Sequence, residues 1–460
     1  MTIILVSSMT NYFMNTYHVV IDDDMIRNML QTDIHETMDL FSLNQVLYFV
    51  FLGLIPSYLV YKTPLKFGSI KIELFKKIKQ IVLLLLIIGL SVFSSFGHYS
   101  TFVREHKPLR FMVNPAYWIY SIGNYISATM NTGEVIIKPI GTDAKVIKSA
   151  NAPSKIVIMI VGEATRADHF SLNGYAKETT PKLQKEKLIN FSNIHSCGTS
   201  TAVSVPCMFS IYTQSQYNYK KGIQSENILD VLNHTNDISI LWRDNNSDSK
   251  GVALRVPYIS YKYNNINTIC ENGECRDEGM LVGLDSYIEE QKDKDILIIL
   301  HQMGNHGPAY FKRYPKAFEK FTPVCKTNQL EECTQEEISN AYDNAILYTD
   351  DFLSKTIALL KKYKNTHQTA MFYMSDHGES LGENGIYLHG LPYFMAPSAQ
   401  THIPAFIWFN ESFKKEVQAQ KIKSNARYTQ DNLFHTLLGL FNVQTSVYDP
   451  TLDIFYTTGK

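Results

Sequence analysis

The chain has little of what marks a fibrous or low-complexity protein, since its 460 residues include only 23 Gly and 16 Pro. A collagen-like repeat is therefore excluded. Neither sign of charge prevails, because 43 Lys and Arg stand against 44 Asp and Glu. Without a basic excess, nucleic acid is not an expected partner. With 45% hydrophobic and 12% aromatic residues, the chain has material for a large core, and its length fits two or three domains.

Charged residues are missing from two stretches near the N-terminus, 40–61 and 80–97. Each stretch is close to the ~20 apolar residues that a helix needs to cross a bilayer. Two buried core helices are the alternative, but apolar runs this long rarely suit a globular core. Residues 1–21 lack Asp, Glu, Lys and Arg as well. We therefore predict a transmembrane region over residues 1–97, with two spans and a partial third span over 1–21.

The loop between the two spans is basic, and this sets the expected orientation. Against one acid, Glu73, it carries Lys62, Lys66, Lys71, Lys76, Lys77 and Lys79. Basic loops stay in the cytoplasm. We therefore expect the acidic segment before the first span, and everything after residue 97, to lie on the outer side.

No cysteine occurs before residue 197, and no C-x-x-C pair is present. An even number of cysteines on the expected outer side favours disulfides in an oxidising compartment. Their spacing in near pairs favours Cys197–Cys207, Cys270–Cys275 and Cys325–Cys333. Reduced buried thiols or a zinc site are the alternatives.

Residues 98–154 separate the spans from the rest of the chain. Their first part carries aromatic rings among basic residues, a composition that favours the headgroup layer of a membrane. We interpret it as a bridge of short interfacial helices, with a plain packed linker as the alternative. A polar stretch with Gly and Pro then leads into a domain expected over 155–460.

That last domain is predicted to be α/β. Short β-rich apolar runs, each bounded by polar residues, occur at 156–161, 238–242, 296–300, 370–374 and 405–409. Such runs suit buried strands of a largely parallel sheet. Helical stretches lie between them, including 226–232 and 336–362. Alternation of this kind predicts an α/β/α sandwich.

Polar side chains collect where these runs end. Glu163, Asp376 and His377 directly follow two of them, and His306 lies a few residues beyond a third. In open α/β sheets, ligands bind at the carboxyl ends of the strands. Carboxylates and imidazoles together suit zinc, among other divalent ions. The pattern therefore indicates a metal site.

Residues 197–207 read Cys-Gly-Thr-Ser-Thr-Ala-Val-Ser-Val-Pro-Cys. If the two cysteines join, a loop rich in hydroxyls is held rigid, and a hydroxyl at a helix start would favour a bound phosphate. Beside a metal ion such a hydroxyl could attack phosphorus. An ordinary N-cap is the alternative. The chemistry alone does not choose among Thr199, Ser200, Thr201 and Ser204.

Several longer segments resemble the phosphoethanolamine transferases that modify lipid A, a family within the alkaline phosphatase and sulfatase superfamily that includes the mobile colistin-resistance enzymes. These segments, together with the 197–207 loop, are 161–169 with 173–175, 242–250, 301–307, 375–379 and 382–389. The resemblance runs from about residue 15 to the C-terminus and implies an alkaline phosphatase/sulfatase-like fold.

The resemblance also implies roles for individual residues. Glu163, Thr201, Asp376 and His377 match the catalytic zinc ligands, with Thr201 as the nucleophile that carries phosphoethanolamine. His306 and His389 match histidines that bind a second zinc or the substrate phosphate and transfer protons. Asn246 and Lys250 match substrate-pocket positions. All six cysteines fit the family's disulfide pairs.

Asn28, Thr32 and Glu36 repeat the family's N-x3-T-x3-E pattern. On one continuous helix this spacing puts all three side chains on one face, where they would line the pocket for the ethanolamine group. An ordinary solvated helix face is the alternative.

The implied reaction moves phosphoethanolamine from phosphatidylethanolamine through Thr201 to lipid A, with one catalytic zinc and a second as an open alternative. The implied protein is a monomer in the bacterial inner membrane, multi-pass, with its catalytic domain in the periplasm. The family has five transmembrane helices, so the sequence is expected to begin inside the third.

Two other readings stay open. The same donor chemistry could serve a core sugar, glycan or protein acceptor. A membrane-anchored zinc- or lipid-binding module without catalysis is the second. A sulfatase would need a C-x-P-x-R motif, which this sequence lacks.

Overall fold

A computed structural model describes residues 1–32, 34–64, 68–130, 135–148, 152–271 and 273–456. By its internal contacts the chain divides into two units. Unit 1 comprises 1–16, 20–22 and 42–123, and unit 2 comprises 17–19, 23–41 and 124–460. Segment 23–41 therefore groups with the large C-terminal unit. The domain limits given above remain a prediction.

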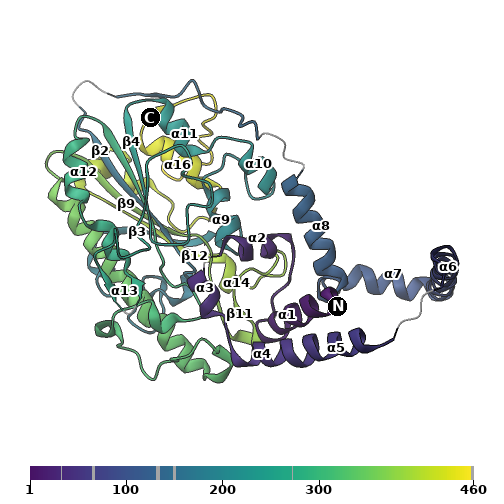
Figure 1. The fold of residues 1–460 in the computed structure, drawn as a ribbon. Helices are drawn as coiled ribbons and strands as arrows, with labels where there is room; N and C mark the ends of the chain where they lie inside the picture. Colours follow the sequence, from purple (N-terminus) through teal and green to yellow (C-terminus); the bar gives the residue numbers. More distant parts are fainter. Residues whose placement is uncertain (33, 65–67, 131–134, 149–151, 272, 457–460) are drawn as a thin grey trace. The chain divides into compact units, whose positions relative to one another are not determined.

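Unit 1 is helical (Figure 1). It begins with α1 (Thr2–Thr16). After segment 23–41, one continuous helical run consists of α4 (Leu43–Tyr48), a π-helix (Phe49–Leu54) and α5 (Ile55–Lys62). The remaining elements are α6 (Ile70–Ser94), α7 (Phe96–Glu105), a 3₁₀ turn (Lys107–Met112) and α8 (Ala116–Met130), and α8 continues into unit 2. Small residues allow α1 and the π-helix to approach closely: a Cβ on Gly53 would lie 2.6 Å from Ser8 Oγ.

Two helices of the described chain are long and apolar enough to cross a membrane, Leu43–Lys62 and Ile70–Ser94. They agree with the two predicted spans, but α6 begins earlier than the expected 80. Ile70, Ile72 and Leu74 continue the apolar pattern, so lysines expected in the loop lie in the first turns of α6. With 15 residues, α1 is shorter than a span.

Unit 2 is built on an eight-stranded sheet in the order β13-β3-β12-β9-β2-β8-β4-β5. In that order the strands are Tyr428–Thr429, Leu188–His195, His402–Phe409, Gln368–Ser375, Lys155–Gly162, Asp295–His301, Ile238–Asp244 and Tyr258–Ser260. Strands β9, β2, β8, β4 and β5 are parallel, and β12 runs antiparallel to both of its neighbours. All five predicted strands are present. Strand β3 was not predicted.

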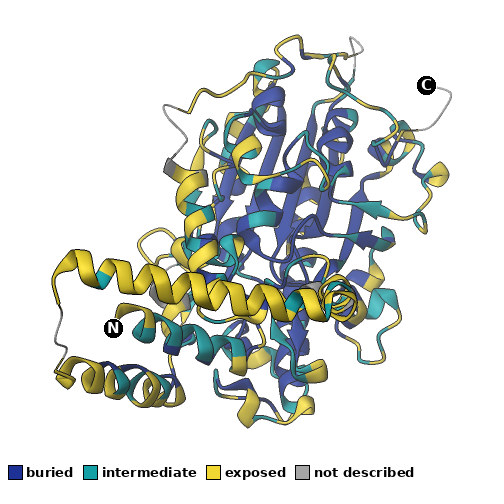
Figure 2. Ribbon diagram, turned by 90° about the vertical axis from the view of Figure 1, so that its right-hand side faces the viewer, coloured by how far each residue is buried: buried dark blue, intermediate teal, exposed yellow. Residues whose placement is uncertain are grey.

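Alternate residues of the central strand β2 enter two separate cores. Val157, Met159 and Val161 pack on one face with side chains of α11 (Ile228–His234) and α16 (Asn432–Leu440). Ile156, Ile158 and Ile160 pack on the other face with α12 (Leu284–Glu290) and α13 (Gln335–Lys362). Figure 2 shows the strands of the sheet as the buried centre of this unit. The predicted α/β/α sandwich is confirmed.

Shorter elements complete unit 2. The helices are α2 (Asp23–Gln31), α3 (Ile34–Asp39), α9 (Thr201–Met208), α10 (Tyr219–Ile223), α14 (Ser398–Thr401) and α15 (Glu411–Glu416). Three two-stranded pairs join β1 (Lys145–Val146) to β14 (Val443–Gln444), β6 (Cys270–Glu271) to β7 (Glu274–Cys275), and β10 (Ser380–Leu381) to β11 (Tyr387–Leu388).

Substitution of Ile158 by Ala tests the core. Its side chain is fully buried on β2, so we expect Ile158→Ala to lower the free energy of unfolding by about 2–5 kcal/mol. Ile147→Ala is the matched control, because Ile147 is 56% exposed and should change it by less than about 0.5 kcal/mol. Denaturant unfolding in detergent, followed by near-ultraviolet circular dichroism, measures both. If both substitutions changed the free energy of unfolding equally, the assignment of Ile158 to the core would be contradicted.

Candidate active site

The polar side chains singled out by the sequence meet at one edge of the large sheet. Glu163 follows β2, Asp376 follows β9, and Asn246 follows β4. Because these strands are parallel, their carboxyl ends lie at the same edge. Strand β3 also runs in this direction, since β12 is antiparallel to both β3 and β9. The loop after β3 therefore brings Thr201, the first residue of α9, to the same edge.

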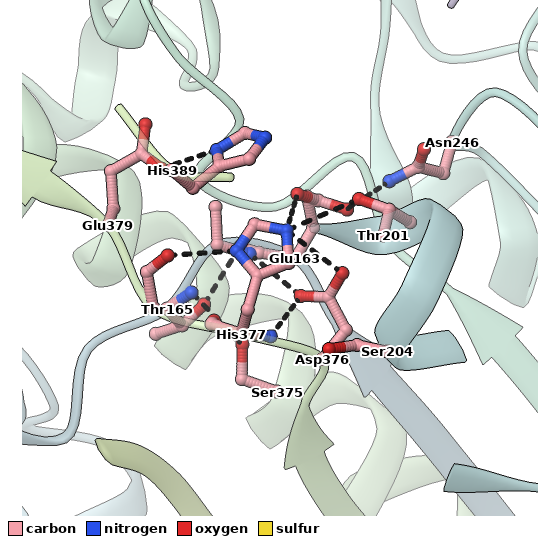
Figure 3. A network of polar contacts seen from close by, with 12 residues as sticks. Glu163, Thr165, Thr201, Ser204, Asn246, Ser375, Asp376, His377, Glu379 and His389 are labelled. Atoms are coloured by element: carbon pink, nitrogen blue, oxygen red, sulfur yellow. Dashed lines mark hydrogen bonds and ion pairs between the residues drawn. The ribbon is translucent and has the colours of Figure 1, made fainter. Parts of the chain in front are cut away.

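Glu163, Asp376 and His377 form the centre of the site (Figure 3). Their ligand atoms lie within 4.8 Å of one another, and all three side chains are fully buried. His377 Nε2 is 3.5 Å from Glu163 Oε1 and 3.3 Å from Asp376 Oδ2. Two carboxylates and one imidazole at this spacing form a set of ligands for a divalent cation such as zinc.

The hydrogen bonds of His377 fix which nitrogen faces the carboxylates. Nδ1 lies 2.8 Å from the carbonyl oxygen of Gly378, which can only accept, so Nδ1–H is the donor. Burial lowers the pKa of His377 despite the opposing charge of Asp376, which favours the neutral ring. Nε2 then directs a lone pair at two carboxylates. A bound cation would turn this repulsion into coordination.

Asp376 is oriented through its other oxygen. Its Oδ1 accepts hydrogen bonds from the backbone N–H groups of Ala164 (3.1 Å) and His377 (2.6 Å), while Oδ2 accepts none from the described residues. Ala164 holds a positive φ of 52°, which costs a residue with a Cβ some strain. The chain therefore turns sharply after Glu163, and this turn points the N–H of Ala164 at Asp376.

Of the four hydroxyls that the sequence left open, the structure brings Thr201 to the cluster. Its Oγ1 is 3.0 Å from Glu163 Oε2 and 3.3 Å from His377 Nε2. Thr199 Oγ1 donates to the carbonyl of Leu391 (2.6 Å), and Ser204 Oγ accepts from the N–H of Gly198 (3.0 Å). Ser200 is the N-cap of α9 and makes no side-chain cap bond.

A second polar group surrounds His389. Glu379 Oε2 accepts from its Nδ1 at 2.7 Å, and Oε1 accepts from Tyr310 at 2.7 Å. Glu379 is fully buried and, with His377 and His389, makes a second potential metal-binding group. The sequence analysis did not single out Glu379. Its position directly after the Asp376-His377-Gly378 segment was the available indication.

The two outer histidines differ electrostatically. Burial lowers the pKa of His306, and the charges of His389 and Arg313 act in the same direction. Burial also opposes the charged form of His389, but the charge of Glu379 and its hydrogen bond outweigh this and raise the pKa. The rings lie 5.7 Å apart, centroid to centroid. His389 is therefore suited to donate a proton, and neutral His306 to bind as a base.

Asn246 and Lys250 have partners that were not predicted. The Asn246 amide donates to Glu163 Oε2 at 2.7 Å and to the carbonyl of Gln302 at 2.9 Å, so it orients a proposed metal ligand. Lys250 Nζ donates to Ser247 Oγ at 2.6 Å and to the carbonyl of Gln31 at 3.3 Å. It thereby contacts the end of α2. Substrate contacts by either residue stay a prediction.

The expected continuous helix through Asn28, Thr32 and Glu36 is wrong. α2 ends at Gln31, and α3 begins at Ile34. The Thr32 hydroxyl donates to the carbonyl of Asn28 at 2.7 Å, the group to which a helix would direct the backbone N–H of Thr32. The side chain of Glu36 lies outside the described part of the chain. The pattern therefore spans two short helices.

The cysteines are joined as Cys197–Cys207, Cys270–Cys275 and Cys325–Cys333. These are the predicted pairs. The first closes the loop that carries Thr201 and the first two turns of α9. A covalently closed loop restricts the positions that the hydroxyl can take.

Comparison with known proteins gives the family. A profile described as Sulfatase matches residues 155–443, and one described as Phosphoethanolamine transferase EptA/EptB matches residues 1–130. The phosphatidylethanolamine transferase Mcr-2 of Escherichia coli is 45% identical over 456 residues, covering 96% of this chain and 83% of that protein. The phosphoethanolamine transferase EptA of Escherichia coli K12 is 39% identical over 463 residues, covering 99% of this chain and 84% of that protein. The chain belongs to the phosphoethanolamine transferase family.

A solved structure of a phosphoethanolamine transferase supports the assignment independently. EptA from Neisseria meningitidis, an integral membrane protein, matches with a TM-score of 0.93 at 33% identity, covering 98% of this chain and 85% of that one. The resemblance seen in the sequence and the alkaline phosphatase/sulfatase-like fold are thus confirmed. Like that relative, the chain joins an N-terminal membrane region to a soluble α/β domain.

Beside the cluster, this transferase has a pocket of about 340 Å³ lined by Asp39, Asn245, Lys262, Met303 and Arg313, among others. Burial and the positive charge of Arg313 lower the pKa of Lys262 from 10.5 to about 8, against the opposing charge of Glu274. Because the folded-state pKa is below the unfolded one, the unfolded chain binds more protons between these values. Stability contributed by this group therefore rises with pH across that window.

We expect Lys262→Met to be more stable than the wild type below about pH 8 and to lose this advantage toward pH 10.5, where the wild-type amine is neutral. Thermal unfolding of both proteins in detergent between pH 7 and pH 10.5 tests this. A stability difference that is independent of pH would contradict the assigned environment of Lys262.

Proposed function

We propose that this chain transfers phosphoethanolamine from phosphatidylethanolamine to lipid A through a covalent intermediate on Thr201. The observation that carries this proposal is the position of the Thr201 hydroxyl, 3.0 Å from Glu163 and 3.3 Å from His377 in a buried cluster. Membership of the phosphoethanolamine transferase family supports the group transferred. The relative Mcr-2, named a phosphatidylethanolamine transferase, supports the donor.

Glu163, Thr201, Asp376 and His377 would hold a zinc ion. The fit rests on two fully buried carboxylates and on a histidine whose Nε2 lone pair faces them. When bound, zinc would supply a Lewis acid that favours the deprotonated Thr201 oxygen and polarises the phosphoryl group. His306, His389 and Glu379 surround a position where a second ion or the substrate phosphate would bind.

In the first step the oxygen of Thr201 forms a bond to phosphorus, and the bond from phosphorus to the glycerol oxygen breaks. The hydroxyl proton passes toward Glu163 Oε2, to which the Thr201 hydroxyl donates at 3.0 Å. The leaving diacylglycerol oxygen takes a proton from His389, whose charged form Glu379 stabilises. Diacylglycerol departs and phosphoethanolamine remains on Thr201.

In the second step an acceptor phosphate oxygen forms a bond to the same phosphorus, and the bond from phosphorus to Thr201 breaks. The leaving Thr201 oxygen takes back the proton held by Glu163, and a proton from the acceptor phosphate or from water restores His389. A relative named Kdo(2)-lipid A phosphoethanolamine 7''-transferase, 26% identical over 436 residues, supports an acceptor of the lipid A class. The product masks a negative charge and adds an amine. Weaker attraction of cationic peptides, and hence polymyxin resistance, follows electrostatically.

We place the protein in the bacterial inner membrane as a multi-pass monomer, with unit 2 in the periplasm. Two helices suited to crossing a membrane and the match of residues 1–130 to the membrane part of the family support this. Three disulfides in unit 2 fit an oxidising compartment. The lysines at the end of α5 and in the first turns of α6 favour a cytoplasmic position for the junction between the two spans.

Thr201→Ala tests the proposed nucleophile. We expect loss of at least about 10³-fold in turnover, because the attacking atom is removed, and loss of the phosphoethanolamine adduct on this residue. Diacylglycerol release from fluorescent phosphatidylethanolamine in detergent with zinc, together with mass spectrometry of the protein, measures both.

Two controls separate chemistry from folding. Thr201→Ser retains a hydroxyl and should keep measurable turnover, whereas Ser204→Ala removes a neighbouring hydroxyl whose role is to accept from Gly198. If Thr201→Ala turned over the lipid at the wild-type rate, the proposed intermediate would be contradicted. Lipid binding without turnover in the wild type would instead favour a non-catalytic lipid-binding module.

A further inference from the structure

A buried arginine outside the proposed metal site connects three distant parts of unit 2. The side chain of Arg313 is 2% exposed. Nε donates to the carbonyl of His306 at 2.8 Å, Nη1 to Glu274 at 2.6 Å, and Nη2 to Asp39 at 2.9 Å. None of the segments that resemble the family contains this residue, and the proposed reaction does not use it.

The first contact fixes the backbone of a proposed catalytic residue. His306 follows β8 in a loop that is held at its start by Asp277, which accepts from the N–H groups of Met303 (2.9 Å) and Gly304 (3.2 Å). Arg313 holds the end of the same loop through the carbonyl of His306. The ring of His306 therefore depends on both anchors for its place beside His389.

The second contact comes from a hairpin that is itself closed covalently. Glu274 lies in β7, next to Cys275, and Cys275 is joined to Cys270 of β6. Arg276 on the same hairpin donates to the carbonyl of Lys312 at 2.6 Å. The hairpin thus provides a rigid carboxylate for Arg313.

The third contact comes from the segment that precedes the first membrane-spanning helix. Asp39 ends α3 and is 7% exposed. Its carboxylate pairs with Arg313 and with Lys312, and its carbonyl accepts from Asn328. The same segment contains Asn28 and Thr32, and Lys250 contacts it at Gln31. Asp39 therefore ties the segment proposed to bind the lipid head group to Arg313.

We infer that Arg313 is a positioning residue that couples Asp39, at the membrane end of segment 23–41, to His306 in the catalytic site. The inference rests on the proposed function and deepens it. Seating of this segment sets the position of His306, so the chemistry is complete only when the segment next to the membrane is docked.

The chemistry of the guanidinium explains why arginine occupies this position. Its planar fork donates in three fixed directions, whereas the ammonium of lysine is a point charge on a flexible stem. Two carboxylates, Asp39 and Glu274, balance Arg313 and Lys312. Removing one partner of such a buried set leaves an uncompensated charge, which the neighbouring groups must move to relieve.

Asp39→Asn is the most informative substitution, because it keeps the shape and removes the charge. We expect kcat for phosphatidylethanolamine to fall about tenfold or more, since displacement of a catalytic group by about 1 Å can cost ~100-fold. KM should change by less than about twofold. Arg313→Lys should behave in the same way, because lysine cannot replace the fork.

Hydrogen exchange in the full chain gives a readout that is independent of turnover. Asp39→Asn should speed amide exchange in peptides covering 302–307, with no change in peptides covering 375–379. Lys316→Ala is the matched control, since it breaks a surface pair with Glu319 in the same region and its side chain is 74% exposed. It should leave kcat and exchange as in the wild type.

Each result decides the inference. A rise in KM with constant kcat would mean that Asp39 serves lipid binding alone, and would overturn the coupling. Faster exchange throughout unit 2, or no local change at 302–307, would also overturn it. If the wild type shows no turnover while Thr201→Ala is equally inactive, the proposed function fails, and the exchange data still decide whether Asp39 controls the His306 loop.

Discussion

Two carboxylates buried side by side are the constraint on which the catalytic unit depends. Glu163 and Asp376 are fully removed from solvent, and the lone pair of His377 Nε2 faces both carboxylates, at 3.5 Å and 3.3 Å. Burial of charge is costly unless it is compensated, and the proposed cation would supply that compensation. The Asn246 amide, the N–H of Ala164 and the Thr201 hydroxyl all point at this cluster.

The parallel sheet explains how groups so distant in sequence come together. β2, β9, β4 and β8 end at one edge, and each supplies a side chain directly or within a short loop. Apolar side chains on both faces make these strands rigid. The hydroxyl comes from α9, whose loop is closed by Cys197–Cys207. Rigid strands therefore carry the proposed metal ligands, and the covalent loop carries the proposed nucleophile.

Much of this arrangement was predictable, because the information is local. The five apolar runs were identified as strands since each is buried on both faces and reads as a continuous apolar stretch. Strand β3 was missed because Leu188–His195 alternates with polar residues and is only partly buried. The helix predicted over 336–362 begins one residue after the observed start of α13 at Gln335. The helix break after Gln31 was missed because the spacing of Asn28, Thr32 and Glu36 is that of one helix face and carries no sign of a break.

The site was predictable where motifs carried it and not where tertiary contacts did. Glu163, Asp376 and His377 follow apolar runs, and this position predicted that their side chains meet at one edge of the sheet. Chemistry alone did not choose Thr201 among four hydroxyls, since the choice depends on tertiary contacts: Thr201 meets Glu163 and His377, whereas Thr199 donates to Leu391. Arg313 could not be found from sequence, because its partner Asp39 lies 274 residues away. Residues that act through backbone carbonyls carry no sequence pattern of their own.

The measurement that tests the central claim most directly is the effect of zinc on thermal unfolding. Wild-type protein stripped with a chelator should unfold at a lower temperature, and added zinc should restore stability, with a gain that grows with the logarithm of the free zinc concentration. Asp376→Asn should respond to zinc more weakly than the wild type, because only the second group of His377, Glu379 and His389 remains intact. A wild-type unfolding temperature that does not depend on zinc, or a zinc effect of wild-type size in Asp376→Asn, would contradict a metal site at these two carboxylates.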